Sequence, residues 1–195
     1  MAPDESESES GLLDQARGGS VLAFEEIVRR YQRRVYATAY RIVRRHQVAD
    51  DVAQEAFIRA HRSLDRFDTR RPFGPWICRI AANLAVNHVR SPQAREDVLP
   101  DGHAETPSAA PGALQRVLDT EAQAMLDRAL GELPAEQRAV FCLRVFEELS
   151  YREIADALGI EMGTVMSRLS RAREKLREAL SPYLATVRRR AGSQP

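Results

Sequence analysis

Residues 150–174, SYREIADALGIEMGTVMSRLSRARE, place three residue types at the spacing that one structural motif requires. Ala155, Gly159 and Val165 follow one another at intervals of four and six positions. Where two helices meet at a tight turn, the first helix needs a small residue at the crossing point. A glycine can take the left-handed conformation that ends this helix, and a valine can pack the second helix against the first. The stretch therefore predicts a helix-turn-helix.

The motif has a clear start and a second helix with two different faces. Ser150 and Glu153 have the spacing of a capping box, which marks the beginning of a helix. In the second helix four apolar residues at helical spacing are expected to face the core: Val165, Leu169, Ala172 and Leu176. The opposite face carries Thr164, Ser167, Arg168 and Arg171.

This polar face suits the major groove of DNA. Arginine can form paired hydrogen bonds with guanine, whereas serine and threonine contact bases less selectively. Three further side chains are expected to contact phosphates and set the register: Tyr151, Arg152 and Arg173. The alternative is a solvated basic face in a plain helical bundle, but the Ala, Gly and Val spacing favours DNA recognition.

Composition limits the remaining function classes. The chain has 195 residues, 44% of them hydrophobic, and a net charge of +1, so it can form folded cores and its charge alone predicts no polyanionic partner. Cys78 and Cys142 form no CxxC pair and the four histidines are scattered, so we expect no metal, disulfide or cofactor. No catalytic constellation or apolar run of about 20 residues occurs, which predicts a cytoplasmic protein that is neither an enzyme nor inserted in a membrane.

Helical periodicity extends through most of the chain and predicts an all-α fold. We expect helices over the apolar stripe from Phe24 to Val43, from Asp50 or Asp51, and after Pro75. Helical order returns at Thr120 and ends near Pro182. The expected organisation is an acidic, partly disordered segment (1–19), a helical domain (20–91), a flexible Pro/Gly/acidic linker (92–119), a second helical domain (120–184) and a basic tail (185–195).

The first domain contains residues 66–90, RFDTRRPFGPWICRIAANLAVNHVR, in which aromatic residues alternate with arginines. Proteins hold unstacked bases with this combination, and asparagines can recognise base edges. The candidates for single-strand binding are Phe67, Arg70, Arg71, Phe73, Trp76, Arg79, Asn83, Asn87 and Arg90. The alternative leaves Trp76 and Phe73 in the core and lets Asn83 bridge helices.

These segments together resemble a known family. DVAQEAFIRAHRSLDRF and FGPWICRIAANLAVNHVR resemble sigma regions 2.2 and 2.3–2.4, and LPAEQRAVFCLRVFEELSYREIADALGIEMGTVMSRLSRARE resembles sigma region 4. The order and the gap are those of the extracytoplasmic-function (ECF) group of sigma factors of bacterial RNA polymerase, and the similarity covers residues 12–182. The first domain then corresponds to sigma region 2 and the second to sigma region 4.

The resemblance implies a role for particular residues. Asp51, Gln54 and Glu55 match the surface that binds the β′ clamp helices of core polymerase. Phe67, the loop through Phe73, and Asn83 match positions that engage a flipped base and the non-template strand of the −10 element, and Asn87 matches a more variable position. Ser167, Arg168 and Arg171 match the −35 recognition helix. The implied partners are core RNA polymerase (β′ clamp helices and β flap), double- and single-stranded promoter DNA, and an anti-sigma factor.

Three functions follow as hypotheses. The first is a promoter-specificity factor whose two domains contact elements about 60 Å apart, at about 3.4 Å per base pair. The second is an autonomous helix-turn-helix regulator that acts without polymerase. The third is an interaction protein such as an antagonist of sigma factors, which would not need a groove-recognising arginine face.

Overall fold

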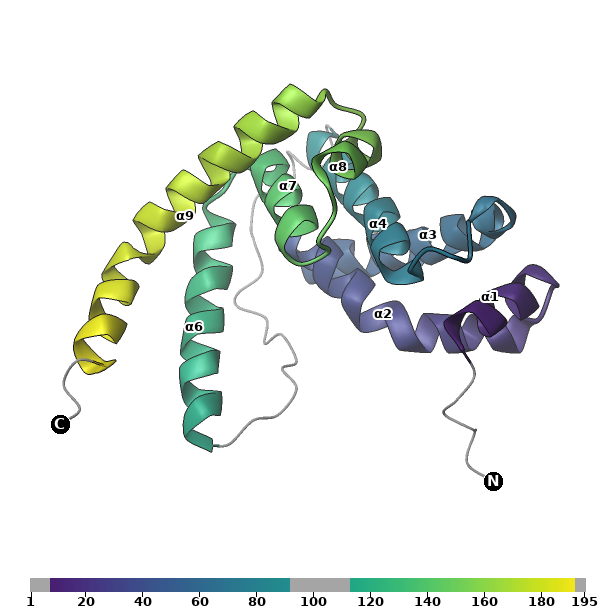
Figure 1. Cartoon of the computed structure of the whole chain (residues 1–195), viewed down its shortest axis with the longest axis horizontal. Helices are drawn as coiled ribbons and strands as arrows, with labels where there is room; N and C mark the ends of the chain where they lie inside the picture. The colour runs from purple at the N-terminus through teal and green to yellow at the C-terminus, as the bar shows by residue number, and fades with distance from the viewer. Residues whose placement is uncertain (1–7, 92–112, 192–195) are drawn as a thin grey trace.

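The computed structural model describes residues 8–91 and 113–191, and the regular structure in these ranges is entirely helical. The first group comprises α1 (Glu9–Arg17), α2 (Val21–Val43), α3 (His46–Ser63), the short 3-10 helix η1 (Leu64–Arg66) and α4 (Phe73–Arg90). The second comprises α6 (Ala113–Gly131), α7 (Ala135–Val145), α8 (Tyr151–Leu158) and α9 (Met162–Ala191). The all-α prediction is confirmed (Figure 1), whereas residues 92–112 of the predicted linker lie outside the described residues.

The first group is built around α2, which packs against α1, α3 and α4. Ser20 caps α2 by accepting a hydrogen bond from the Ala23 amide at 3.3 Å. The face of α2 that carries Ile27, Val35 and Ile42 is buried, as its helical spacing predicts.

The segment 1–19 contains a helix that the sequence analysis did not predict. Residues 9–17 of this acidic segment form α1, and Ser8 caps it by accepting from the Gly11 amide at 3.2 Å. Leu12, Leu13 and Ala16 share one face and are almost fully buried. Residues 9–17 are therefore helical, because three apolar side chains anchor them to the core, while residues 1–7 of the segment lie outside the described residues.

Two helices of the first group begin earlier than predicted. α3 starts at His46 rather than at Asp50 or Asp51, because Val48 and Ala49 pack into the core and extend the helix by a turn. α4 starts at Phe73 rather than after Pro75. Pro75 falls within the first turn, where the missing amide hydrogen would have no partner within the helix.

Two boundaries in the second group also differ from the prediction. α6 begins at Ala113, so Thr120 lies inside the helix and the predicted linker is shorter at its end. The residues from Ala113 onward include Leu, Gln and Arg, which favour helix. α9 continues through Pro182 to Ala191, beyond its predicted end and into the predicted basic tail. The Ala- and Arg-rich sequence after the proline supports this continuation.

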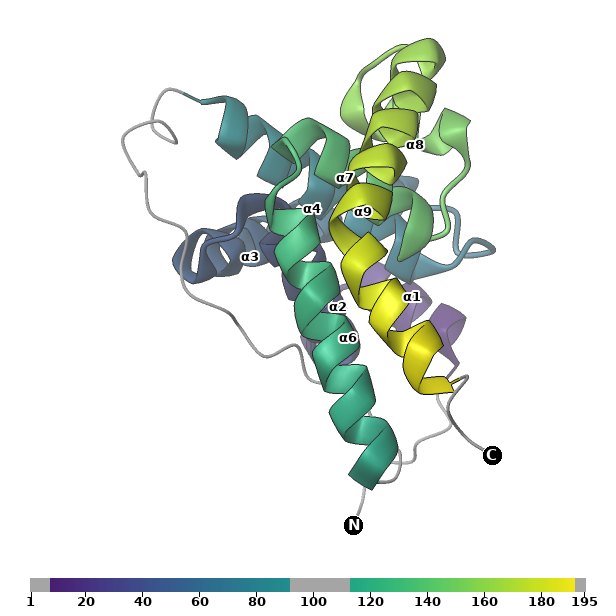
Figure 2. The same cartoon turned by 90° about the vertical axis from the view of Figure 1, so that its left-hand side faces the viewer.

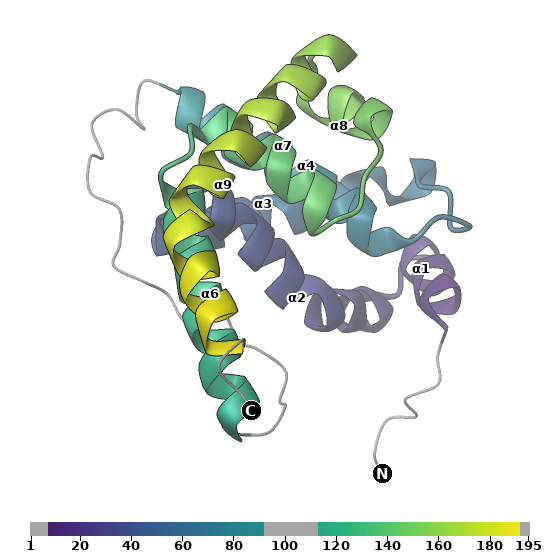
Figure 3. The same cartoon turned by 60° about the vertical axis from the view of Figure 1, so that its left-hand side comes forward.

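The second group is arranged around α9. α6 and α9 run side by side in all three views (Figures 1, 2 and 3), and Leu130 and Leu133 pack with Ala172 and Leu176 between them. α7 and α8 pack against the N-terminal part of α9.

The two groups of helices pack against each other and share one buried cluster, while a second cluster lies within the second group. α7 packs against α2 and α4, and α8 packs against α4, so that Ile77 of α4 and Val140 and Ile154 of the second group belong to one buried cluster. The predicted organisation of two helical domains and a linker did not include contacts between the domains. Their mutual packing has no local signature, because it joins residues that are far apart in the chain.

Two buried polar residues fix this packing. Glu147, 3% exposed, accepts hydrogen bonds from Arg34 at 2.8 Å and from the Thr38 hydroxyl at 2.9 Å. Arg138, 6% exposed, donates to the carbonyl of Ile42 in α2 and to backbone carbonyls at the end of α6. Burial lowers the pKa of Arg138 to about 10, so it remains charged at neutral pH.

Candidate nucleic-acid interface

The helix-turn-helix forms as its sequence predicts. The amide of Ser150 donates to Glu153 at 2.9 Å, and the amide of Glu153 donates to the Ser150 hydroxyl at 3.3 Å, which completes the capping box. The Ser150 hydroxyl also donates to the Glu153 carboxylate at 2.7 Å, and the bonds from the Ser150 amide and hydroxyl lower the pKa of Glu153. Gly159 ends α8 with φ 61°, and Val165 is completely buried beneath the turn.

The polar face of α9 lies opposite its buried face. Val165, Leu169 and Ala172 are buried, while Ser167 and Arg171 are exposed. Thr164 is half-buried, and its carbonyl accepts a hydrogen bond from Ser167 at 3.1 Å. Two side chains of the predicted recognition helix are therefore open to solvent.

Arg168 has a different environment from Arg171. Its side chain is only 18% exposed and pairs with Glu136 of α7 at 2.5 Å. The same carboxylate pairs with Arg90 of α4 at 2.7 Å. Two arginines predicted to bind different DNA segments thus share one carboxylate.

The three side chains that were predicted to contact phosphates differ in their exposure to solvent. Arg152 and Arg173 are exposed. Tyr151 is half-buried, with the Arg144 guanidinium 5.6 Å from its ring centre.

The aromatic residues of the first group form a cluster beside the loop that joins η1 to α4 (residues 67–72, the α3–α4 loop). The ring centres of Phe67 and Trp76 are 4.6 Å apart, and those of Phe73 and Trp76 are 5.4 Å apart. Phe73 is completely buried, as the core alternative expected, while Phe67 is 6% exposed and Trp76 is half-buried. In this arrangement the rings of Phe67 and Phe73 are covered by protein.

The remaining α3–α4 loop carries two exposed arginines, Arg70 and Arg71, beside the half-buried Asp68. Arg70 donates to Asp68 from Nε at 2.8 Å and from Nη2 at 2.9 Å, and Arg71 is exposed. The hydrogen bonds from Arg70 lower the pKa of Asp68 to about 2.

The polar side chains of α4 that were predicted to contact single-stranded DNA are only partly accessible. Asn87 is exposed and donates to the Asn83 side chain at 3.3 Å, while Asn83 and Arg79 are half-buried. The amide pair thus remains at the surface of the helix.

A cleft of about 700 Å³ lies between the two groups. Arg71, Trp76 and Arg79 line it from the first group, and Arg152 and Glu153 line it from α8. The structure therefore brings side chains predicted to contact the −10 and −35 elements to the same cleft.

The third predicted surface lies on α3. Asp51 and Gln54 are exposed, and the half-buried Glu55 pairs with Arg59 at 2.7 Å. Ile58, which the sequence analysis did not select, is 45% exposed on the same helix. Its position three residues after Glu55 could have indicated an apolar part of this surface.

The part of the chain that the structure describes contains neither a candidate metal site nor a candidate membrane span. Within 8–91 and 113–191 no group of His, Cys, Asp and Glu could hold a metal ion. Burial raises the pKa of both Cys78 and Cys142 to about 12, so these thiols are core residues. No helix in the same ranges is long and apolar enough to cross a membrane.

Comparisons with known proteins agree with this architecture. Residues 27–96 match the family model of Sigma-70 region 2, and residues 123–176 match that of Sigma-70, region 4. The RNA polymerase sigma-H factor of Pseudomonas aeruginosa is 36% identical, over 91% of this chain and 96% of the relative. The ECF RNA polymerase sigma factor SigW of Bacillus subtilis is 34% identical, over 86% of this chain and 94% of the relative.

The chain belongs to the ECF group of the sigma-70 family. This sigma factor is also similar to two solved structures. The complex of the sigma factor RpoE with the anti-sigma factor NepR from Bartonella quintana matches with a TM-score of 0.61 and 25% identity, over 83% of this chain and 98% of the other. CnrH in complex with the cytosolic domain of CnrY matches with a TM-score of 0.57 and 29% identity, over 90% and 99%.

Proposed function

We propose that this RNA polymerase sigma factor recognises the −35 element as duplex with α9 and captures the melted −10 element with the α3–α4 loop and α4. The observation that carries this proposal is the division of α9 into a buried apolar face and an exposed face with Ser167 and Arg171. A helix anchored in this way can enter the major groove without disturbing its own core. The exposed Asn87 and the loop arginines Arg70 and Arg71 supply the polar groups for the single strand.

The α3 surface is the proposed contact with core polymerase. Asp51 and Gln54 project from a helix whose other side is buried, and the exposed Ile58 adds an apolar contact. An apolar centre with polar neighbours is typical of protein interfaces. Through this contact the factor acts as a polymerase subunit in the cytoplasm.

The compact arrangement cannot bind both promoter elements at once. The two sets of predicted DNA-contacting residues line one cleft, and Arg168 and Arg90 share Glu136. The two elements are about 60 Å apart on DNA, at about 3.4 Å per base pair. We therefore infer that the second group separates from the first when the holoenzyme binds a promoter.

An anti-sigma factor is the proposed partner of the compact form. The similar structure of RpoE is a complex with the anti-sigma factor NepR. A partner that binds both groups of helices would stabilise their packing and keep the two DNA-binding surfaces together.

Run-off transcription with purified core polymerase on a library of promoters tests the proposed function. The expected result is initiation from a subset of promoters that share a −35 and a −10 sequence, and none with core polymerase alone. Gel shifts on a selected promoter distinguish the alternative. An autonomous helix-turn-helix regulator would bind without core polymerase, whereas a sigma factor requires it for tight binding.

A further inference from the structure

We infer that α1, which precedes the region matched by the family model, positions the α3–α4 loop for recognition of the flipped −10 base. This inference rests on the proposed function of that loop. α1 spans residues 9–17, and the match to Sigma-70 region 2 begins at residue 27. The helix packs against both α2 and η1, which brings it next to the start of the loop.

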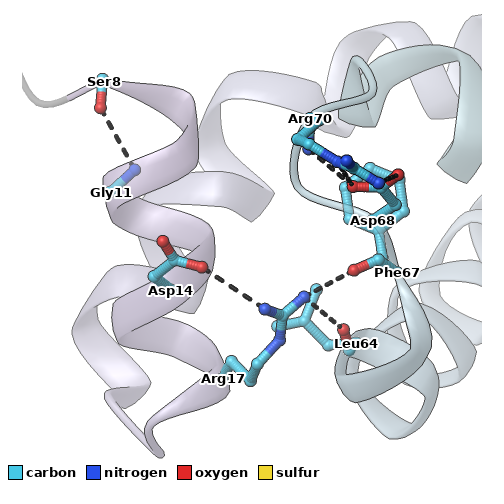
Figure 4. A network of polar contacts seen from close by, with 8 residues as sticks. All are labelled: Ser8, Gly11, Asp14, Arg17, Leu64, Phe67, Asp68 and Arg70. Carbon is cyan, nitrogen blue, oxygen red and sulfur yellow. Dashed lines mark hydrogen bonds and ion pairs between the residues drawn. The ribbon is translucent and has the colours of Figure 1, made fainter.

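Arg17 at the end of α1 holds the beginning of the loop. Its Nη2 donates to the carbonyl of Phe67 at 2.6 Å and to that of Leu64 at 3.2 Å (Figure 4). Both acceptors are backbone carbonyls, one at the first residue of η1 and one at the residue that follows it, so the guanidinium fixes the direction in which the chain enters the loop. Asp14 contacts Nη1 of the same side chain at 3.4 Å, from an exposed position.

Glu9 at the start of α1 holds the end of the loop. Its Oε1 accepts from the amide of Phe73 at 3.0 Å, and its Oε2 accepts from the Tyr31 hydroxyl. Phe73 is the first residue of α4, where amide groups lack partners within the helix and a negative charge is favourable. The carboxylate therefore fixes the residue at which the loop becomes α4.

The two contacts enclose the segment that carries the specificity. Residues 68–72 lie between the two anchored positions. The hydrogen bond between Arg70 and Asp68 stays within this segment, so the contacts that hold its two ends come from α1. Loop residues in an exposed turn lose conformational entropy when they bind a base, and anchored ends reduce this loss. Arg17 and Glu9 are thus positioning residues, because they act through the backbone of the loop.

Arg17→Ala and Glu9→Ala test this inference in the holoenzyme. The probes are single-stranded −10 oligonucleotides with each of the four bases at the flipped position. We expect each variant to bind the preferred oligonucleotide about tenfold more weakly, the size of a lost charge-assisted hydrogen bond, and to discriminate less among the bases. Affinity for a −35 duplex should not change. Arg17→Lys, which retains a charged donor, should recover part of the discrimination, and Asp14→Ala should resemble the wild type.

A second measurement follows the loop without DNA. Trp76 is the single tryptophan of the chain and its ring contacts Phe67, so acrylamide quenching of its fluorescence reports on the start of the loop. Quenching should increase in Arg17→Ala and not in Asp14→Ala, at an unchanged melting temperature. If Arg17→Ala does not fold, Glu9→Ala and Arg17→Lys carry the test.

The outcomes separate the inference from the proposed function. Wild-type discrimination that persists in both alanine variants overturns the role of α1, whatever the quenching shows. Equal weakening of all four oligonucleotides also overturns it, because that result indicates a structural role alone. A wild-type holoenzyme that does not discriminate among the bases contradicts the proposed function of the loop, and the inference with it.

Discussion

The helix-turn-helix and the α3–α4 loop are held in place in different ways, although both are proposed to contact DNA. The helix-turn-helix is fixed by neighbours in sequence, such as the Ser150–Glu153 capping box and the left-handed Gly159. The loop is fixed by Arg17 and Glu9, which act on Phe67 and Phe73 over 50 and 64 positions. A locally fixed element can be recognised from its sequence, whereas a loop fixed from a distance requires the structure.

The largest expected effect concerns the anchor of the loop. Phe73→Ala should lower the free energy of unfolding by about 3–5 kcal/mol, because the ring is completely buried against Phe67 and Trp76. Urea denaturation measures this change. Arg71→Ala, in the exposed part of the loop, is the control and should stay within about 0.5 kcal/mol. A cost as small for Phe73 as for Arg71 would show that the loop is not anchored in the core.

The next effect concerns recognition of the −35 element by the helix-turn-helix. Arg171→Ala should reduce −35 discrimination at a single base pair by about 1–3 kcal/mol, because the exposed arginine of α9 is proposed to contact a base. Competition binding of the holoenzyme with −35 sequence variants measures it.

Asn83→Ala is the matched variant in α4. It should preserve −35 discrimination and reduce the permanganate reactivity of unpaired thymines at −10. Equal losses in both assays for both variants would contradict the division of labour.

A smaller effect tests the Ser150–Glu153 capping box, which fixes the start of the helix-turn-helix. Ser150→Ala should destabilise the protein by about 0.5–2 kcal/mol, because the capping box is lost while no buried apolar contact is removed.

The pH dependence of stability gives a second check of the capping box. The Ser150 hydrogen bonds lower the pKa of Glu153, so their contribution is present above the unfolded pKa of Glu153 and is lost as the pH falls through the folded value. Ser150→Ala keeps the amide that donates to Glu153 and loses the hydroxyl, so the stability difference between wild type and variant should narrow at acidic pH. It should not vanish, because the bond from the Glu153 amide to the Ser150 hydroxyl does not depend on the carboxylate charge. A difference that does not change with pH would contradict the contribution of the hydroxyl–carboxylate bond.

The smallest effect concerns the Asp68–Arg70 pair inside the α3–α4 loop. NMR titration should place the pKa of Asp68 near 2, below its ordinary 3.8, because Arg70 donates to its carboxylate. Arg70→Ala should return the pKa toward 3.8. The stabilising contribution of the pair is present above pH 3.8 and disappears as the pH falls through about 2. An unshifted carboxyl in the wild type would indicate that the inner part of the loop is not ordered by this pair.

The sequence predicted the parts of the fold that follow from local patterns. The Ala155, Gly159 and Val165 spacing gave the helix-turn-helix, and the apolar stripe of α2 gave its buried face. The acidic composition of residues 1–19 concealed α1, whose three apolar residues were too few to stand out. The return of helical periodicity at Thr120 suggested a helix start inside what is α6.

The parts that could not be predicted depend on distant pairs. Glu147 meets Arg34 and Thr38 over 113 and 109 positions, and such contacts have no periodicity or motif. The sequence therefore identified the candidate DNA-binding residues without showing that several of them share a cleft. The buried ring of Phe73 likewise packs against a ring that is distant in the chain, that of Tyr31 of α2.

The most direct test of the account is the distance between the two DNA-binding surfaces before and after promoter binding. Asp65→Cys beside the loop and Asp156→Cys in α8 offer exposed labelling sites, while the native thiols are buried with pKa values near 12. Fluorescence energy transfer between the two labels should be strong in the free sigma factor. It should fall in the promoter-bound holoenzyme to a value consistent with about 60 Å, the spacing of the promoter elements. Unchanged transfer in a transcribing complex would contradict the separation of the two groups of helices.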